Sequence, residues 1–431
     1  MEKIFQLQAH GTTVKREILA GLTTFLTMAY ILAVNPGMLG IIGNGITPGA
    51  VFTATAIASA IATLVMAFTA NLPVALAPGM GLNAFFAFTV VLGMGYSWQL
   101  ALTAVFLEGV VFVILSFFNV REAIIKAIPM NLKKAVAVGI GLFIALIGFA
   151  NAGIVVNDAG TIIGLGNLSS PSPFMALVGL ILIIVLYALK VPGSILIGIL
   201  ATTVISIALG IAAVPAGWSL FSAPAAPLFF QFDFSNIFSF QFFAVFFTFL
   251  FVDIFDTVGT LMGVATQAKL IDKHGNIPNV KQALLADAIG TVAGAALGTS
   301  TVTSFIESSA GVASGGRTGL TALTTGLLFL VSLVLSPLFL LVPTFATAPA
   351  LIFVGFLMIA PVVEIDFKDP TEGIPAFLAI VMMPFAYSIA EGIVYGLLSY
   401  TLLKAVTGKL KDIPTVTWVL FVIFFLRFFI N

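Results

Sequence analysis

Five carboxylates stand inside long apolar stretches of this 431-residue chain, namely Glu108, Asp253, Asp256, Asp287 and Glu307. If those stretches cross a membrane, each charge costs about 2.5–3.5 kcal/mol to insert, and residues retained at that cost usually have a function. No Lys or Arg lies within the same stretches to neutralise them. These carboxyl groups are therefore candidates for binding a substrate or for carrying a proton.

Asp253 and Asp256 lie together in the segment FTFLFVDIFDTVGTLMG. A spacing of three residues puts them on one face of a helix, and Thr257 extends that polar face. We expect this face to line a substrate cavity, with one carboxylate binding substrate N–H groups and the other structural or proton-coupled. The residues do not decide which of the two aspartates has which role. In the alternative interpretation, the pair only hydrogen-bonds to neighbouring helices and stabilises the core.

Two apolar segments, near residues 72–92 and 300–315, are interrupted by Gly, Pro and small polar residues. We expect their first parts, Val74–Ala77 and Thr299–Thr303, to run extended. Irregular backbone at membrane depth is tolerated only where it is buried in protein or lines a cavity. Interrupted segments at corresponding positions of two halves indicate the binding site of a transporter.

The interrupted segments supply further candidate residues. Asn83 follows a Gly-rich turn, and its amide both donates and accepts hydrogen bonds, as recognition of a heterocycle edge requires. In the alternative interpretation, the amide only satisfies the interrupted backbone. Glu307 is expected either to accept hydrogen bonds from the substrate or to cap its own half-helix. Gly81, Ser308 and, in the first apolar segment, Thr27 complete the expected substrate-binding set, with Tyr30 as the alternative to Thr27 for lining the cavity.

The chemistry of this set limits the substrate. Carboxylates, an amide and hydroxyls are present, and no cation is, so an anion would find no counter-charge. Hydrogen bonds to carboxylates are about twice as strong as neutral ones, which favours a planar base rich in N–H groups or a simple cation. The residues alone leave both open. We expect Asp253, Asp256 and Glu307 to carry the coupling proton. Glu108 and Asp287 each stand alone, and either take part in function or hydrogen-bond to neighbouring Ser and Thr.

The elements that must position these residues are membrane-spanning helices. The chain is 60% hydrophobic and 8% charged, with a mean hydropathy of +1.20, whereas soluble domains carry about 25% charge. Apolar runs of about 20 residues recur along its length, which predicts an all-α polytopic membrane protein. The fourteen expected spans lie near 17–37, 50–70, 72–92, 98–118, 133–150, 173–190, 194–213, 239–265, 282–298, 300–315, 318–342, 346–364, 372–386 and 388–407.

The Lys and Arg residues support this count. With a cytoplasmic N-terminus, fourteen helices place the basic loop residues on the cytoplasmic side, which they favour. The expected outer loops, 38–49, 151–172 and 214–238, contain no Lys or Arg. The terminal stretch 416–430 is either a fifteenth span or an interfacial helix.

Fourteen helices divide into residues 1–213 and 239–407, followed by a C-terminal hydrophobic helix at 412–431. Seven helices per half is an odd number, so homologous halves would insert with opposite orientation, as in inverted-repeat transporters.

Other functions find little support. There is no Cys, and His10 and His274 fall outside the apolar runs, so no Cys or His metal site is expected inside the membrane. No basic patch indicates nucleic-acid binding. We therefore expect neither a metal nor a cofactor.

At these residues the chain closely resembles the AzgA-like purine permeases, the adenine, guanine and hypoxanthine branch of the nucleobase:cation symporter-2 or nucleobase-ascorbate transporter superfamily. The resemblance covers nearly the whole chain. It rests on five blocks: GLTTFLTMAYILAVNP at 21–36, VFTATAIASA at 51–60, APGMGLNAFFAFTVVLGMG at 77–95, FLFVDIFDTVGTL at 249–261 and LGTSTVTSFIESSAGVASGGRTG at 297–319.

The resemblance implies a uracil-permease-like fold of seven plus seven inverted repeats, with short strands in helices three and ten. It implies a core domain, residues 17–118 plus 239–342, and a gate domain, residues 133–213 plus 346–407. A homodimer through the gate domains is a further expectation.

The resemblance also implies a function. The chain is expected to import purine nucleobases across the cytoplasmic membrane together with protons, by alternating access. The binding residues of the family fall on Asn83, Asp253, Asp256 and Glu307.

Three alternatives belong to other classes. A membrane-embedded hydrolase would use the paired Asp residues as an aspartyl dyad, but the interrupted helices favour a transporter over an enzyme. An anion transporter lacks the intramembrane Lys or Arg that it would need. A channel would show repeated subunit motifs, which the sequence does not contain.

Overall fold

The computed structural model describes residues 2–117, 129–158, 160–271 and 277–430. Four basic residues that the sequence places in loops lie outside these ranges: Arg121, Lys126, Lys273 and His274. The chain forms two compact units. Unit 1 comprises Met1–Ile114 and Gly148–Ala350, and unit 2 comprises Leu115–Ile147 and Leu351–Asn431.

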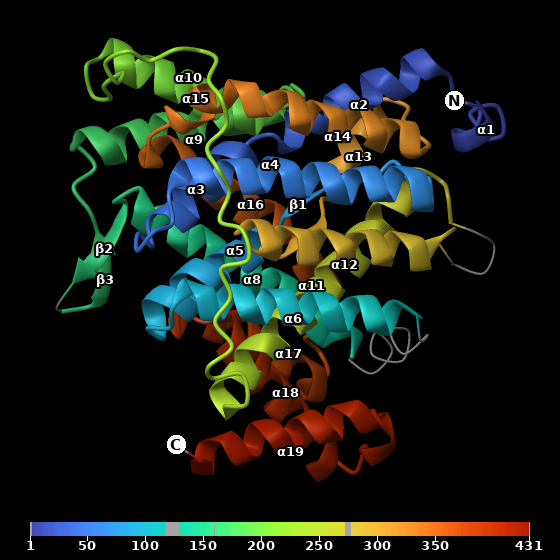
Figure 1. Ribbon diagram of the computed structural model, residues 1–431. Helices are drawn as coiled ribbons and strands as arrows, with labels where there is room; N and C mark the ends of the chain where they lie inside the picture. Colours follow the sequence, from blue (N-terminus) through green and yellow to red (C-terminus); the bar gives the residue numbers. More distant parts are fainter. Residues whose placement is uncertain (1, 118–128, 159, 272–276, 431) are drawn as a thin grey trace. The chain divides into compact units, whose positions relative to one another are not determined.

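Unit 1 contains both interrupted segments and all the expected site residues. Its elements in the first part of the chain are α1 (Glu2–Phe5), α2 (Val14–Met28), α3 (Ile31–Gly40), α4 (Pro48–Val65), the π-helix η1 (Met66–Ala70), β1 (Leu76–Pro78), α5 (Met80–Ala84), the π-helix η2 (Phe85–Gly93) and most of α6 (Trp98–Phe117). The elements that follow are β2 (Val155–Asp158), β3 (Ile162–Leu165), α9 (Pro171–Ala188), α10 (Ser194–Ala208), α11 (Phe240–Gln267), α12 (Val280–Leu297), β4 (Val302–Ser304), α13 (Ser308–Ala313), α14 (Gly319–Ser332), the 3₁₀-helix η3 (Leu333–Leu335) and α15 (Ser336–Leu340). Figure 1 shows α2 beside α14, and α4 beside α12.

Unit 2 is helical in its described part. Two helices, α8 (Met130–Asn151) and α16 (Thr344–Met358), are shared between the units. The others are the 3₁₀-helix η4 (Ala360–Glu364), α17 (Pro370–Phe385), α18 (Ile389–Val406), the 3₁₀-helix η5 (Leu410–Asp412) and α19 (Thr415–Ile430).

Ion pairs join α8, α17 and α18 at one end of unit 2. Lys404 lies 2.7 Å from Glu372, whose other oxygen accepts a hydrogen bond from Asn131. Lys409 lies 2.7 Å from Asp369, the N-cap of α17. A buried Lys such as Lys404 requires such a partner, because an unpaired buried charge is strongly destabilising.

Within the described ranges, ten helices are long and apolar enough to cross a membrane, and three shorter apolar helices accompany them. The residue range of each of these helices overlaps one of the expected spans. The remaining expected span, 300–315, contains β4 and the six-residue α13 in place of a continuous helix. The prediction of an all-helical polytopic membrane protein is confirmed; the count of fourteen and the inverted repeat stay predictions.

Polar caps and prolines set many of the helix starts. Thr13, Thr47 and Ser239 accept a hydrogen bond from the first turn of α2, α4 and α11 respectively. Pro48 and Pro171 occupy the first positions of α4 and α9, where the missing N–H costs nothing. These caps satisfy backbone donors that would otherwise be orphaned.

The first expected span is divided where the sequence predicted one helix. A turn at Ala29 and Tyr30 separates α2 from α3, and Leu32 N and Ala33 N donate back over three residues. The turn places Tyr30, which is fully buried, next to α13.

The two interrupted segments meet as a two-stranded antiparallel sheet, β1 with β4, in which Ala77 faces Thr303. Gly79 N donates to Thr301 O and Phe305 N donates to Ala75 O, so the residue after each strand bonds to the residue before the other. The segments predicted to be extended, Val74–Ala77 and Thr299–Thr303, are confirmed to contain strands. The strands begin and end one to three residues later than predicted. Each strand leads into a short helix, α5 or α13.

Each strand is held to a neighbouring helix by a threonine. Thr63 of α4 exchanges two hydrogen bonds with the backbone of Leu76, at 2.9 and 3.1 Å. Thr291 of α12 does the same with Val302, at 2.9 and 3.3 Å. Leu76 and Val302 are the first residues of their strands, so the two attachments are equivalent. They satisfy backbone groups that a lone strand would leave unpaired at membrane depth.

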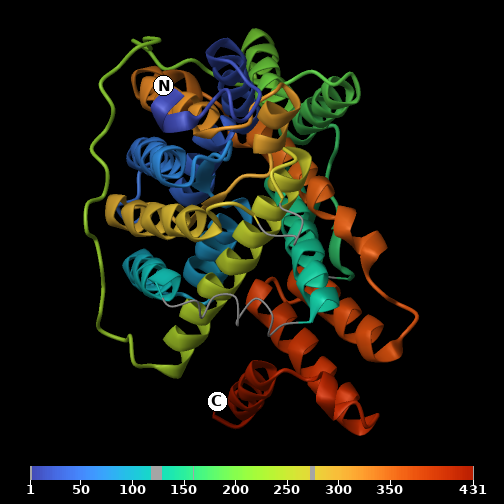
Figure 2. The same ribbon diagram turned by 90° about the vertical axis from the view of Figure 1, so that its right-hand side faces the viewer.

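Residues 209–239 run without regular structure along one side of unit 1, as the extended yellow-green segment in Figure 2. Backbone hydrogen bonds attach it to three elements of the unit. Ser222 N donates to Val334 O, Leu228 N to Leu297 O, and Asp233 N to Thr103 Oγ1 of α6. The segment that separates the two expected halves is therefore held to η3, α12 and α6.

Candidate functional site

Glu307 is the N-cap residue of α13, and its side chain makes no capping hydrogen bond to that helix. The carboxylate instead accepts a hydrogen bond of 2.6 Å from the hydroxyl of Tyr30. The turn between α2 and α3 presents Tyr30 to this position. The arrangement fixes Oε1 and argues against the alternative in which Glu307 merely caps its own half-helix.

Asp253 and Asp256 lie one turn apart on α11, as the spacing predicted. Asp253 is fully buried, whereas Asp256 is partly exposed. Asp256 interacts electrostatically with Glu307 and Tyr30, so α3, α11 and α13 bring three polar side chains together. Asp256 therefore lies within electrostatic reach of Glu307.

Asn83 lies fully buried in α5, just past β1. Its Nδ2 donates to Pro78 O at 3.3 Å, and its Oδ1 accepts a hydrogen bond from Ser300, which precedes β4. The amide thus joins the two interrupted segments.

Thr257 is directed into the core. Its hydroxyl donates to Asp287 Oδ1 at 2.6 Å and lies 2.7 Å from the hydroxyl of Thr303 in β4. A hydroxyl has one proton, so with Asp287 ionised Thr257 donates there and accepts from Thr303. The chain of bonds links α12, α11 and β4 behind Asp256, and gives Asp287 a role as an anchor.

The remaining expected residues surround Glu307 and the strand crossing. Ser308 Oγ accepts a hydrogen bond of 3.0 Å from Ala75 N. Thr27 donates mainly to Thr24 O at 2.8 Å and lies 3.4 Å from Glu307 O. Gly81 is a half-buried position of α5.

The aromatic residues next to Asn83 serve packing. Phe85 and Phe86 are fully buried and lie 4.9 and 6.4 Å from Phe249 between ring centroids. They join η2 to α11 and support the helix that carries both aspartates.

Tyr30 was expected to be a possible lining residue of the cavity, but its hydrogen bond to Glu307 was not predicted. Two further residue groups of the site region were not predicted from the sequence. The hydroxyl run Thr299–Thr301 was expected only to run extended. Glu17, fully buried in α2, accepts four hydrogen bonds from Arg317 N, Thr318 and Thr321 at 2.6–3.2 Å. Its position beside Lys15 and Arg16 resembles an ordinary charged helix end.

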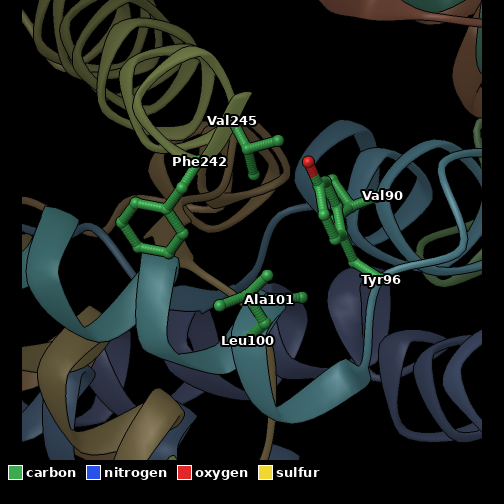
Figure 3. A pocket seen from close by; sticks show the side chains of 6 residues that line it. All are labelled: Val90, Tyr96, Leu100, Ala101, Phe242 and Val245. Carbon is green, nitrogen blue, oxygen red and sulfur yellow. The ribbon is translucent and has the colours of Figure 1, made fainter. Parts of the chain in front are cut away.

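An apolar pocket lies elsewhere in unit 1, between η2, α6 and α11. Figure 3 shows its lining side chains, Val90, Tyr96, Leu100, Ala101, Phe242 and Val245. Its one polar side chain, Tyr96, donates a hydrogen bond of 2.8 Å to Gln241. It shares no residue with the cluster around Glu307 and lacks convergent polar groups, which a site for a polar ligand needs. Within the described ranges, no three His, Asp or Glu side chains are grouped to hold a metal ion.

Comparisons with known proteins place the chain in a family. Residues 15–395 match the sequence profile described as the permease family. The chain is 47% identical to the guanine/hypoxanthine permease PbuO of Bacillus subtilis, over 99% of this chain and 100% of that protein. It is 43% identical to the adenine permease AdeP of Escherichia coli, over 99% of this chain and 95% of that protein.

Among solved structures, the transmembrane domain of a cyanobacterial bicarbonate transporter, BicA, superposes with a TM-score of 0.65. The match covers 89% of this chain and 97% of that domain, at 16% sequence identity. At that identity the likeness concerns the fold alone.

The relatives are permeases rather than enzymes, and the resemblance drawn from the five sequence blocks to the AzgA-like purine permeases is confirmed. The chain belongs to the permease family.

Proposed function

We propose that this protein imports purine nucleobases, namely adenine, guanine and hypoxanthine, by proton symport across the cytoplasmic membrane. The observation that carries the proposal is the meeting of Tyr30, Asp256 and Glu307 at the crossing of the two interrupted segments. The names of the adenine and guanine/hypoxanthine permeases, similar over almost their full lengths, support purines as the substrates.

The base binds between α3, α5, α11 and α13. Carboxylates accept hydrogen bonds from ring N–H groups, and Asp256 and Glu307 are suited to this task because each has an oxygen beyond the protein contacts described above. Charge-assisted bonds of this kind are about twice as strong as neutral ones. Asn83 contributes the amide contact, while Asp253, fully buried one turn away on α11, is the less accessible aspartate.

The coupling proton is carried by a carboxyl group of the same cluster. A charge at membrane depth is costly, so a proton that neutralises Asp253, Asp256 or Glu307 during transport lowers the cost of moving the site. Asp256 is the leading proton carrier, because Glu307 is engaged by Tyr30 and Asp253 is fully buried.

Alternating access comes from movement of a core domain, residues 17–118 and 239–342, against a gate domain, residues 133–213 and 346–407, in a 7+7 inverted repeat. The equivalent attachments of Thr63 to β1 and Thr291 to β4 support such a repeat. The Lys and Arg distribution supports fourteen helices with a cytoplasmic N-terminus. A homodimer through the gate domains belongs to the same proposal.

The test is uptake of radiolabelled adenine, guanine, hypoxanthine and uracil into proteoliposomes. We expect at least one purine to accumulate when an inward proton gradient is imposed, and the accumulation to collapse when a protonophore is added. Accumulation that is unaffected by the gradient would remove the proton coupling, and no purine uptake under either condition would overturn the proposal.

Two variants test the site in the same assay. We expect Asp256→Asn and Glu307→Gln each to reduce purine uptake at least about 10-fold at equal protein level, since each loses a charged acceptor worth about 1.5–3 kcal/mol. Asp233→Asn, which changes a half-buried carboxylate in the segment 209–239 that accepts from Ser235 N, is the matched control and should transport normally. Wild-type uptake by both site variants would remove these residues from the mechanism.

A further inference from the structure

Three consecutive hydroxyl residues, Thr299, Ser300 and Thr301, precede β4, and all three are fully buried. Each contacts a different element of unit 1. Asn35 Nδ2 of α3 donates to Thr299 at 2.9 Å, and Thr301 donates to Glu108 of α6 at 3.3 Å. Ser300, between them, donates to Asn83 of α5.

The neighbours of Ser300 hold it in place. The backbone O of Thr301 accepts from Gly79 N at 3.0 Å, and Asn35 Nδ2 also donates to Thr55 at 2.8 Å. Ser300 is therefore part of a segment that is tied to three helices and to the other strand. Its hydroxyl lies at a defined position relative to Asn83.

The orientation of the Asn83 amide follows from its two partners. Pro78 O can only accept, so the atom of the amide that faces it must be the nitrogen. Oδ1 then faces Ser300, whose hydroxyl must donate. One N–H of the amide is used by Pro78, and the second N–H is the group that remains for a ligand.

We propose that Ser300 is a positioning residue that fixes the Asn83 amide so that it offers the substrate a hydrogen-bond donor. This inference rests on the proposed function and names the chemistry of one contact. The carboxylates of Asp256 and Glu307 accept from the N–H groups of the base, and Asn83 donates to an unprotonated ring nitrogen of the base. The site thus distinguishes the donor edge of a purine from its acceptor edge.

The inference predicts a specific pattern with purine analogues. Replacing one ring nitrogen by C–H removes one acceptor at a time in the 1-, 3- and 7-deaza analogues of adenine and in the 3- and 7-deaza analogues of hypoxanthine, because N9 of both bases and N1 of hypoxanthine carry a proton. We expect the purified wild-type protein to bind at least one analogue about 10-fold more weakly than its parent base, as measured by competition against a radiolabelled purine. Asn83→Ala should abolish the difference for that analogue.

The decisive variants concern Ser300. In Ser300→Ala the buried Oδ1 loses its donor and the amide is no longer fixed, so we expect the ratio of analogue to parent Kd to fall from about 10 toward 1. Ser300→Thr retains the hydroxyl and should restore the ratio. Thr299→Val, which removes the neighbouring hydroxyl and leaves Asn83 untouched, should keep the wild-type ratio.

The outcomes separate this inference from the proposed function. If Ser300→Ala weakens binding of the parent and the analogue equally, Ser300 has only a structural role and the inference is wrong. If no single ring nitrogen matters in the wild type, Asn83 is not a donor to the base and the inference is also wrong. If the wild type binds no purine, the proposed function itself fails.

Discussion

The hydroxyl of Tyr30 donates a hydrogen bond of 2.6 Å to Glu307 Oε1. The two residues are separated by 277 positions in the sequence. They meet because the turn between α2 and α3 lies next to the start of α13. It leaves Oε2 as the oxygen of Glu307 that no protein donor described above occupies. A carboxylate with one oxygen fixed is oriented before its ligand arrives, which reduces the entropy lost on binding.

Tyr30→Phe should therefore weaken purine binding. A hydrogen bond to a charged group contributes about 1.5–3 kcal/mol, so we expect the Kd to rise at least about 10-fold while the protein remains folded. Calorimetric titration of the purified variant measures this. Tyr96→Phe removes a different hydroxyl, one bonded to Gln241, and should leave the Kd unchanged. An unchanged Kd for Tyr30→Phe would show that Glu307 does not need this donor.

Thr257→Val tests the bond chain behind the site. The substitution keeps the shape of the side chain and removes the hydroxyl that joins Asp287 to Thr303. A buried carboxylate that loses its donor costs about 1–3 kcal/mol, so the unfolding temperature should fall and transport should decrease with it. Thr266→Val removes a hydroxyl that bonds only to its own helix, at Met262 O, and should unfold as the wild type does. Equal unfolding temperatures for the two variants would contradict the anchoring role.

Much of the architecture was predictable because the membrane restricts the choice of structure. Apolar runs in lipid must be helical, and the clusters of Gly, Pro and small polar residues around Asn83 and Glu307 marked where helices could not continue. The carboxylate pair Asp253 and Asp256 was found by helical spacing alone. These features depend on residues that are close together in the sequence, so they can be inferred without knowing which distant segments meet.

What the sequence did not predict depends on contacts between distant segments. Tyr30 becomes a partner of Glu307 only through the turn before α3, and Ser300 meets Asn83 only where the two strands cross. The π-helix η2 was also missed, because a span that is apolar on all sides has no pattern of polar residues to reveal its period.

Glu17 was missed for a different reason, and it supports a further prediction. Its carboxylate accepts from two backbone N–H groups and two hydroxyls at the start of α14, next to the end of α13. Glu17→Ala leaves these buried donors unsatisfied and should cost about 2–5 kcal/mol. Glu17→Gln keeps one acceptor oxygen and should cost less.

The unfolding temperatures of the purified variants should therefore decrease in the order wild type, Glu17→Gln, Glu17→Ala. Glu2→Gln changes an exposed carboxylate near the same end of unit 1 and is the control. Unfolding of Glu17→Ala at the wild-type temperature would mean that water replaces the carboxylate without cost.

The ion pair of Asp369 with Lys409 predicts a pH dependence in unit 2. The Lys409 ammonium, 2.7 Å away, together with the N–H and hydroxyl of Thr371, holds the pKa of Asp369 well below its usual range. A carboxyl whose pKa is lowered by folding stabilises the fold above its unfolded pKa, about 3.9, and this contribution is lost as the pH falls toward the lower folded value. Asp369→Asn keeps an N-capping side chain and removes only the charge.

We therefore expect the wild type to unfold at a higher temperature than Asp369→Asn between pH 5 and 7, and the difference to shrink as the pH falls below about 4. Thermal unfolding of both proteins across this range measures it. The pair is half-buried and in contact with solvent, so the difference should be small. Asp366→Asn, whose carboxylate accepts from Lys368 N, should show a smaller difference. A difference that stays constant from pH 3 to pH 7 would mean that the Asp369 charge does not contribute, and that the side chain acts only as a helix cap.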